Sequence, residues 1–144
     1  HKEINPEIAK HRLKMVKIAT AHEPKFDVSD REDKLWENGE KSYSLNTVKK
    51  IREIYNIKEK LNFIIGTDAF EKIESWYKAE ELSGLVHFIV FPRGVELTPK
   101  EKFDYEMAPM KFFDVSSTDL RVHHSQNNRL KEVEEYIKKN GLYN

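Results

Sequence analysis

The apolar positions of this chain follow a helical period in three places, each bounded by residues that start or stop helices. The first stripe follows Asn5-Pro6, the second follows Ser44, which can cap a helix, and the third ends at Asn140-Gly141. The stripes consist of Ile8, Ala9, Leu13, Val16 and Ala19; of Leu45, Val48, Ile51 and Tyr55; and of Leu130, Val133 and Ile137. We therefore expect helices that begin near residues 6 and 44 and a helix that closes the chain.

Shorter apolar runs between these stripes predict strands. Residues 25–30 (KFDVSD) alternate between apolar and polar and lead into a polar loop that extends through Glu37-Asn38-Gly39. Residues 62–68 (NFIIGTD) form a continuous apolar run, which favours a strand covered on both faces. Further strands are expected at 86–94 (VHFIVFPRG) and at 110–115 (MKFFDV).

Strands therefore alternate with helices along most of the chain. The segment 69–82 is amphipathic and aromatic and supplies a helix between two strands, and SSTDLR (116–121) opens another helix. This order favours an α/β fold with a Rossmann-like, doubly wound and mostly parallel sheet that carries helices on both faces. Because the sequence contains no internal repeat and no low-complexity linker, we expect residues 1–144 to form a single domain.

The composition narrows the class of partner. The 25 basic and 25 acidic residues cancel, which removes a global electrostatic reason for binding nucleic acid or an anionic membrane. The chain has no cysteine, no apolar run as long as a membrane helix and no recognisable signal peptide. We therefore expect a cytoplasmic protein that recognises phosphate locally, if at all. The chain starts at His1 without an initiator methionine, so we also expect residues upstream of it.

Polar clusters follow three of the expected strands. They are Gly66-Thr67-Asp68, Pro92-Arg93-Gly94 and Ser116-Ser117-Thr118. In a doubly wound sheet, ligands bind beyond the carboxyl ends of the strands, so the three clusters together indicate a binding site.

The third cluster suits a phosphate. Backbone N–H groups at the start of a helix lack partners and lie at the positive end of its dipole, and Ser116, Ser117 and Thr118 add hydroxyl donors. Arg121 follows one helical turn later and can bring a fixed positive charge to the same point. The simpler alternative is a helix cap with a solvated arginine.

Two other features of the sequence could contact a nucleotide. Gly66 permits close approach of a ligand to the backbone, and Asp68 can accept hydrogen bonds from ribose hydroxyls; the alternative is a turn with a helix cap. Trp76 can stack on a flat heteroaromatic ring, or it can be a core residue at helical spacing from Ile73. The six histidines form no convincing metal site, and His87 is expected within an apolar strand.

The combination of these segments resembles one family, the bacterial nicotinate-nucleotide adenylyltransferases. The similarity covers nearly the whole chain in the right order. It rests on His1-Lys2, HRLKMVKIA (11–19), SYSLNTV (42–48), FIIGTDAF (63–70), Trp76-Tyr77, FPRG (91–94), VSSTDLR (115–121) and YIKKNGLY (136–143).

The resemblance implies an activity and a set of site residues. The family joins nicotinate mononucleotide to the adenylyl group of ATP, makes deamido-NAD and releases pyrophosphate, with Mg²⁺ carried on the ATP phosphates. The implied catalytic residues are Lys2, Arg93 and Arg121. Those implied for ATP are Gly66, Asp68, Ser116, Ser117, Thr118 and Arg121, and those implied for the mononucleotide are His1, Lys2, Ser44, Trp76 and Tyr77. Trp76 would stack on the pyridine ring, and backbone N–H groups near Ser44 and Tyr77 would receive the nicotinate carboxylate.

The chain departs from the family pattern in two places. The family's G-x-F-D-P-x-H-x-G-H motif lies on a first strand upstream of the position of His1, so the nucleotidyltransferase domain is expected to be N-terminally incomplete as given. The stretch 122–129 (VHHSQNNR) is shorter and more polar than its family counterpart. Two alternatives remain open: the same fold acting on nicotinamide mononucleotide or phosphopantetheine, and a non-catalytic nucleotide-binding module. The sequence leaves the oligomeric state unknown.

Overall fold

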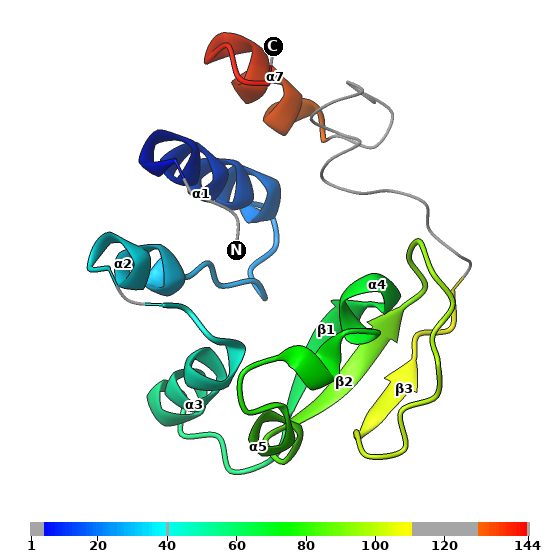
Figure 1. Cartoon of the computed structure of the whole chain (residues 1–144). Coiled ribbons are helices and arrows are strands. Elements are labelled where there is room, and N and C mark those ends of the chain that lie inside the picture. The colour runs from blue at the N-terminus through cyan, green and yellow to red at the C-terminus, as the bar shows by residue number, and fades with distance from the viewer. Residues whose placement is uncertain (1–4, 40, 111–129, 144) are drawn as a thin grey trace. The chain divides into compact units, whose positions relative to one another are not determined.

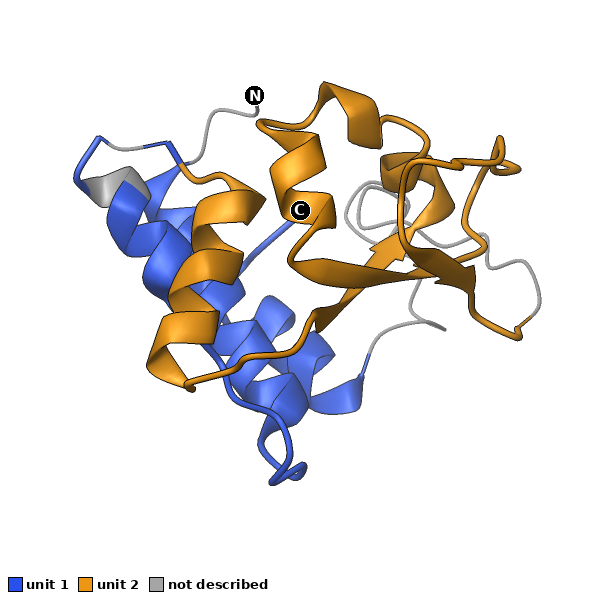
Figure 2. Cartoon of the chain, turned by 90° about the horizontal axis from the view of Figure 1, so that it is seen from below, with its two compact units in different colours: residues 1–41, 116–144 blue, residues 42–115 orange. Residues whose placement is uncertain are grey.

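The computed structural model describes residues 5–39, 41–110 and 130–143, apart from the side chains of residues 36 and 37. The chain divides into two compact units, residues 1–41 with 116–144 and residues 42–115, coloured separately in Figure 2. Among the described residues, the first unit is helical and the second holds the sheet (Figure 1). The expectation that residues 1–144 form a single domain stays a prediction.

The elements that the structure describes are three helices, then strands and short helices, and a closing helix. They are α1 (Pro6–Thr20), α2 (Arg31–Glu37), α3 (Ser44–Ile54), β1 (Leu61–Gly66), α4 (Thr67–Phe70), the 3₁₀ helix η1 (Ile73–Ser75), α5 (Ala79–Ser83), β2 (Val86–Phe91), β3 (Tyr105–Met107) and α7 (Lys131–Lys139) (Figure 1). Within the described ranges, no helix combines the length and the apolar character needed to cross a membrane.

In the first unit, α1 and α7 pack against each other. The side chain of Asn5 accepts a hydrogen bond from the backbone N–H of Glu7 at 2.9 Å and so caps α1, whose first residue is Pro6. A hydrogen bond of 2.7 Å joins His11 Nδ1 on α1 to the Tyr136 hydroxyl on α7. Both predicted helices are therefore confirmed, and each begins or ends at the signals that the sequence carries.

One predicted strand in this unit is wrong. Residues 26–30 are irregular, and α2 follows where a polar loop was expected. Phe26, an apolar position of the alternating pattern, is 64% exposed, because alternation does not produce a strand without a partner strand. The Ser29 hydroxyl accepts a hydrogen bond from the backbone N–H of Arg31, the first residue of α2.

In the second unit, three parallel strands form a sheet in the order β1-β2-β3 (Figure 1). The ladder between β1 and β2 is regular and runs from the Leu61–Val86 pair to the Gly66–Phe91 pair. Two predicted strands are thus confirmed, and the α/β class with a parallel sheet is correct. The predicted helix at 69–82 is instead divided among α4, η1 and α5. From residue 111 onward, the strand expected at 110–115 lies outside the described residues.

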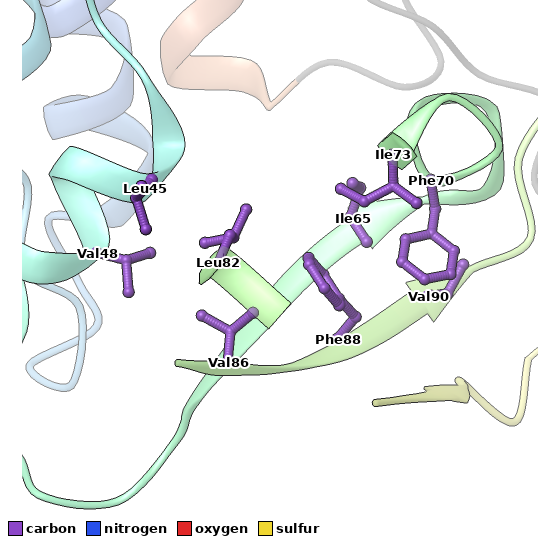
Figure 3. Close-up of a cluster of buried hydrophobic side chains, with 9 residues drawn as sticks. All are labelled: Leu45, Val48, Ile65, Phe70, Ile73, Leu82, Val86, Phe88 and Val90. Atoms are coloured by element: carbon purple, nitrogen blue, oxygen red, sulfur yellow. The ribbon is translucent and has the colours of Figure 1, made fainter. Parts of the chain in front are cut away.

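The core of the second unit lies on one face of this sheet. Phe88 and Val90 of β2 and Ile65 of β1 meet the short helices that follow β1, while Figure 3 shows Leu45 and Val48 projecting from α3 toward this cluster. The buried members are Leu45, Val48, Ile65, Phe70, Ile73, Leu82, Val86, Phe88 and Val90. Since β-strand side chains alternate, the residues between these positions point to the opposite face.

The opposite face of β1 carries Ile64, which is 69% exposed, and Asn62, which is also exposed. Within the second unit, the helices α4 and α5 contact the strands on the core side. The expectation that β1 is covered on both faces stays a prediction.

On β2, the outward position next to Phe88 carries His87, whose ring lies between two carboxylates. His87 Nδ1 is 3.0 Å from Asp104 Oδ1, and Nε2 is 3.2 Å from Glu106 Oε1 of β3. Lys60 Nζ, just before β1, lies 3.1 Å from the other Asp104 oxygen. Hydrogen bonds to Asp104 and Glu106 raise the pKa of His87, and the hydrogen bond from His87 lowers the pKa of Asp104. The histidine thus lies on the face of β2 away from the core and links the short edge strand to β2.

We predict that Phe88→Ala will destabilise the protein by about 3–5 kcal/mol, because the ring is fully buried and its removal leaves a cavity. Urea denaturation monitored by circular dichroism measures the change. The control is Phe26→Ala, since Phe26 is 64% exposed, and it should change stability by less than about 0.5 kcal/mol. Equal effects of the two substitutions would contradict the assigned core.

We also predict that the stabilisation from His87 depends on pH. A raised pKa in the folded state stabilises fully below the unfolded value of about 6.5, and this stabilisation disappears as the pH rises through the folded value. The difference in unfolding free energy between the wild type and His87→Gln should therefore be larger at about pH 5.5 than at about pH 9. The control is His22→Gln, because His22 is exposed. A difference that grows with rising pH would refute the proposed ion pairs.

Candidate functional site

The ends of β1 and β2 are joined by the side chain of Thr67. The Thr67 hydroxyl donates to the carbonyl oxygen of Arg93 at 2.8 Å and accepts from the backbone N–H of Arg93 at 2.8 Å. Thr67 is only 1% exposed, so little water competes for either hydrogen bond. The structure therefore brings together two of the three polar clusters that follow the strands.

Asp68 and Arg93 face each other at this end of the sheet. Arg93 Nε lies 3.7 Å from Asp68 Oδ2, which is an ionic contact and too long for a hydrogen bond. Arg93 Nε is buried and has no hydrogen-bond partner among the described residues, whereas the two side chains as wholes are 40% and 46% exposed. A carboxylate acceptor and a guanidinium donor are thus held next to each other at an accessible position.

Gly66 lies directly beneath this pair. A Cβ atom at position 66 would stand 2.6 Å from Asp68 Oδ1 and 3.2 Å from Arg93 Cδ. The backbone at Gly66 has φ −80°, which any residue can adopt, so the dihedral angles do not require glycine here. A side chain at this position would shift the Asp68 carboxylate away from its present place beside Arg93.

A small cavity adjoins the same strand ends. It has a volume of about 270 Å³ and begins at Thr67 and the turn after β2, where Gly94 adopts φ +73°. Its lining is mostly apolar and consists of Thr67, Pro92, Val95, Glu96, Leu97, Pro99, Tyr105 and Met107. The cavity therefore offers an apolar surface next to the charged Asp68–Arg93 pair.

The loop that forms one wall of this cavity is tied to the segment after α4. Lys100 Nζ, in a side chain only 10% exposed, donates to the Glu71 carbonyl oxygen at 2.9 Å and to Glu74 Oε1 at 2.7 Å. Glu71 Oε2 accepts a hydrogen bond from the backbone N–H of Thr98 at 2.9 Å. Hydrogen bonding from Thr98 lowers the pKa of Glu71, and Lys100 lowers the pKa of Glu74, so both carboxylates stay charged.

Trp76 and Tyr77 lie in different environments. Trp76 is half-buried and makes an edge-to-face contact with Phe63 of β1, with ring centroids 6.0 Å apart. Tyr77 is 43% exposed and stacks on Tyr43, with ring centroids 4.2 Å apart. Trp76 thus packs against the core, as its helical spacing allowed, and Tyr77 contacts the start of α3.

Ser44 is the first residue of α3 and not its cap. Tyr43 occupies the N-cap position, and its side chain makes no capping hydrogen bond, so the predicted role of Ser44 in the helix is wrong. Ser44 nevertheless directly follows Tyr43, whose ring stacks on Tyr77, so the start of α3 lies beside the Trp76-Tyr77 segment. The backbone N–H of Asn46 already donates to the Tyr43 carbonyl oxygen at 3.0 Å, so only the N–H groups of Ser44 and Leu45, at the positive end of the helix dipole, are placed to serve an anion.

The remaining candidate residues are outside the described part of the chain. They are His1, Lys2, Ser116, Ser117, Thr118 and Arg121. In the ranges 5–39, 41–110 and 130–143, no three His, Asp or Glu side chains group together as a metal ion would require. The sequence predicted no separate role for Thr67, which was named only within the cluster Gly66-Thr67-Asp68. Its position directly after a strand was the one feature of the sequence that pointed to its bonds with Arg93.

Comparisons with known proteins agree on one family. The chain matches the cytidylyltransferase-like family over residues 1–123. A protein of Caldicellulosiruptor bescii named "Probable nicotinate-nucleotide adenylyltransferase" is 35% identical over 147 residues, which cover 92% of this chain and 72% of that protein. A Staphylococcus epidermidis protein of the same name is 34% identical, with 94% of this chain and 71% of that protein covered.

Two solved structures are similar in fold. They show Plasmodium falciparum nicotinic acid mononucleotide adenylyltransferase complexed with APC and with NaAD, and their TM-scores are 0.66 and 0.67 at 22% and 21% identity. Each covers 93% of this chain, which in turn covers 75% and 73% of theirs. By its family match and its relatives, the chain belongs to the cytidylyltransferase-like family and, within it, to the nicotinate-nucleotide adenylyltransferases.

Proposed function

We propose that this chain transfers the adenylyl group of ATP to nicotinate mononucleotide and forms deamido-NAD and pyrophosphate in NAD biosynthesis. The observation that carries the proposal is the grouping of Gly66, Asp68 and Arg93 at the carboxyl ends of two paired parallel strands. This is where doubly wound sheets bind nucleotides, and the chain's family joins nucleotides by this chemistry.

The reaction is a displacement at phosphorus. An oxygen of the mononucleotide 5′-phosphate forms a bond to the α-phosphorus of ATP, and the bond from that phosphorus to the oxygen bridging to the β-phosphate breaks. Pyrophosphate leaves with the bonding electrons. Such a step needs alignment of the reactants and stabilisation of negative charge more than covalent help from the protein. Mg²⁺ would arrive on the ATP phosphates as part of the substrate.

Three of the described residues bind ATP or stabilise negative charge in this reaction. Asp68 accepts hydrogen bonds from the ribose hydroxyls of ATP, and Gly66 lets the nucleotide approach the backbone. Arg93 presents its guanidinium to the reacting phosphates, where negative charge develops. The unmet hydrogen-bonding capacity of Arg93 Nε supports this role, since a ligand oxygen could satisfy it.

The remaining roles follow from the family resemblance. Ser116, Ser117, Thr118 and Arg121 hold the ATP phosphates, with Arg121 also catalytic, and His1 and Lys2 meet the mononucleotide phosphate, with Lys2 also catalytic. Trp76 stacks on the pyridine ring, and N–H groups near Ser44 and Tyr77 receive the carboxylate. The contact of Tyr43 with Tyr77 supports the last role because it joins the two segments. The protein acts in the cytoplasm.

Two alternative functions retain the nucleotide-binding site. The same site could accept nicotinamide mononucleotide or phosphopantetheine, or the chain could bind nucleotides without turnover. A pyridine ring is favoured over phosphopantetheine by Trp76, whose indole is held against Phe63 by an edge-to-face contact.

We predict that the protein releases pyrophosphate from ATP when nicotinate mononucleotide is added, measured by coupled phosphate detection and by chromatography of deamido-NAD. With nicotinamide mononucleotide, kcat/KM should be lower by a factor of about 10² or more, because N–H groups built for a carboxylate bind an amide poorly. ATP binding without any turnover would point to the non-catalytic alternative. Equal turnover of both mononucleotides would remove the preference for the acid.

We predict that Arg93→Ala lowers kcat/KM by a factor of about 10²–10³, the usual cost of losing one preorganised donor to a transition state. The control is Arg12→Ala, since Arg12 lies exposed on α1 in the other unit, and it should change kcat/KM less than twofold. A loss below twofold for Arg93→Ala would assign the arginine to the surface rather than to the reaction.

A further inference from the structure

We propose that Thr67 is a positioning residue for the reaction, which acts by fixing the backbone of Arg93. This inference rests on the proposed function. Thr67 would touch no substrate; its hydroxyl would hold the residue whose guanidinium does.

The hydrogen bonding of Thr67 is directed at a single residue. One hydroxyl group accepts from the N–H and donates to the C=O of Arg93, each at 2.8 Å. Serving both groups of one residue constrains its position more than either bond alone. Because threonine is branched at Cβ, its χ1 angle is restricted, so the hydroxyl is already directed before the bonds form. Thr67 is also the single buried polar residue among those that the structure describes.

Arg93 needs this support because the ladder ends before it. The last pair of the ladder between β1 and β2 is Gly66 with Phe91, and Pro92 has no N–H to donate. Beyond that point, Arg93 enters a turn in which its carbonyl also accepts from the N–H of Val95 at 2.8 Å. Thr67 thus continues the connection between the strands for one step past the sheet.

The backbone position of Arg93, which Thr67 fixes, sets the geometry of the ion pair between Arg93 and Asp68. Asp68 follows Thr67 directly on α4, so one residue fixes the backbone from which Asp68 extends and the backbone from which Arg93 extends. The Nε–Oδ2 distance of 3.7 Å over Gly66 results from both. Loss of the hydroxyl would leave the N–H of Arg93 without its acceptor and let the turn move relative to α4.

A stabilising role for the hydroxyl without any effect on Arg93 is the competing explanation. The two explanations differ in whether the effect of Thr67 requires the Arg93 side chain. A structural role predicts that losses from the two residues multiply, whereas a positioning role predicts that the loss from Thr67 disappears when Arg93 is already alanine.

The test is a double-mutant cycle with Thr67→Val, Arg93→Ala and the double variant, assayed for deamido-NAD formation at a temperature where circular dichroism shows each to be folded. We expect Thr67→Val to lower kcat/KM about 5- to 100-fold, mainly through kcat, because an unpaired donor lets the arginine leave its position. Thr67→Ser should restore activity to within about threefold of the wild type, since it keeps the hydroxyl. In the Arg93→Ala background, Thr67→Val should cost less than about twofold.

Thr20→Val is the matched control, because the Thr20 hydroxyl also bonds a backbone carbonyl, that of Val16 at 2.8 Å, in the other unit. It should leave kcat/KM within about twofold of the wild type. A loss from Thr67→Val of similar size in both backgrounds, or no loss in the wild-type background, would overturn the inference. If Thr67→Val does not fold, Thr67→Ala takes its place in the cycle.

The outcome for the wild type separates this inference from the proposed function. A wild-type protein without turnover refutes the proposed function, and the same cycle is then measured as the affinity for ATP by calorimetry. Weaker binding on Thr67→Val only when Arg93 is present would still support the positioning role. A protein that neither turns over nor binds ATP would overturn both.

Discussion

The parallel ladder between β1 and β2 determines where Gly66, Asp68 and Arg93 of the candidate site lie. Its six pairs keep the two strands level, so Gly66 and Phe91 end side by side. The chain then leaves the sheet at both points within three residues, and the polar residues that follow meet because the strands in front of them are paired. The core of the second unit, formed around Phe88, stabilises this pairing from one face of the sheet.

Much of this arrangement could be predicted from the sequence. The apolar runs of β1 and β2, the stripe and cap of α1 and the stop signal after α7 are local features, and each is confirmed. The rule that ligands bind at the carboxyl ends of parallel strands then places Gly66, Asp68 and Arg93 together without coordinates. Their roles in binding and catalysis remain proposals.

What the sequence could not show depends on partners far along the chain. Residues 25–30 alternate like a strand but find no neighbour to pair with among the described residues, and β3 has only three residues, too few to show a period of its own. The setting of His87 depends on Asp104, 17 residues later, and the hydrogen bonds of Thr67 depend on Arg93, 26 residues later. Local patterns contain no information about such pairs, because tertiary contacts create them.

The attachment of the cavity wall through Lys100 has a consequence for variation in chain length. Residues 95–100 are fastened to Glu71 and Glu74, so their length must match the distance between the turn at Gly94 and that anchor. Between Lys100 and β3 the chain has no such anchor to α4 or η1 in the described contacts, apart from the ring contacts of Phe103 in the core. Insertions and deletions should therefore accumulate around residues 101–102 in natural relatives and be absent from residues 95–100, so that the cavity keeps its size while the surface beside it changes.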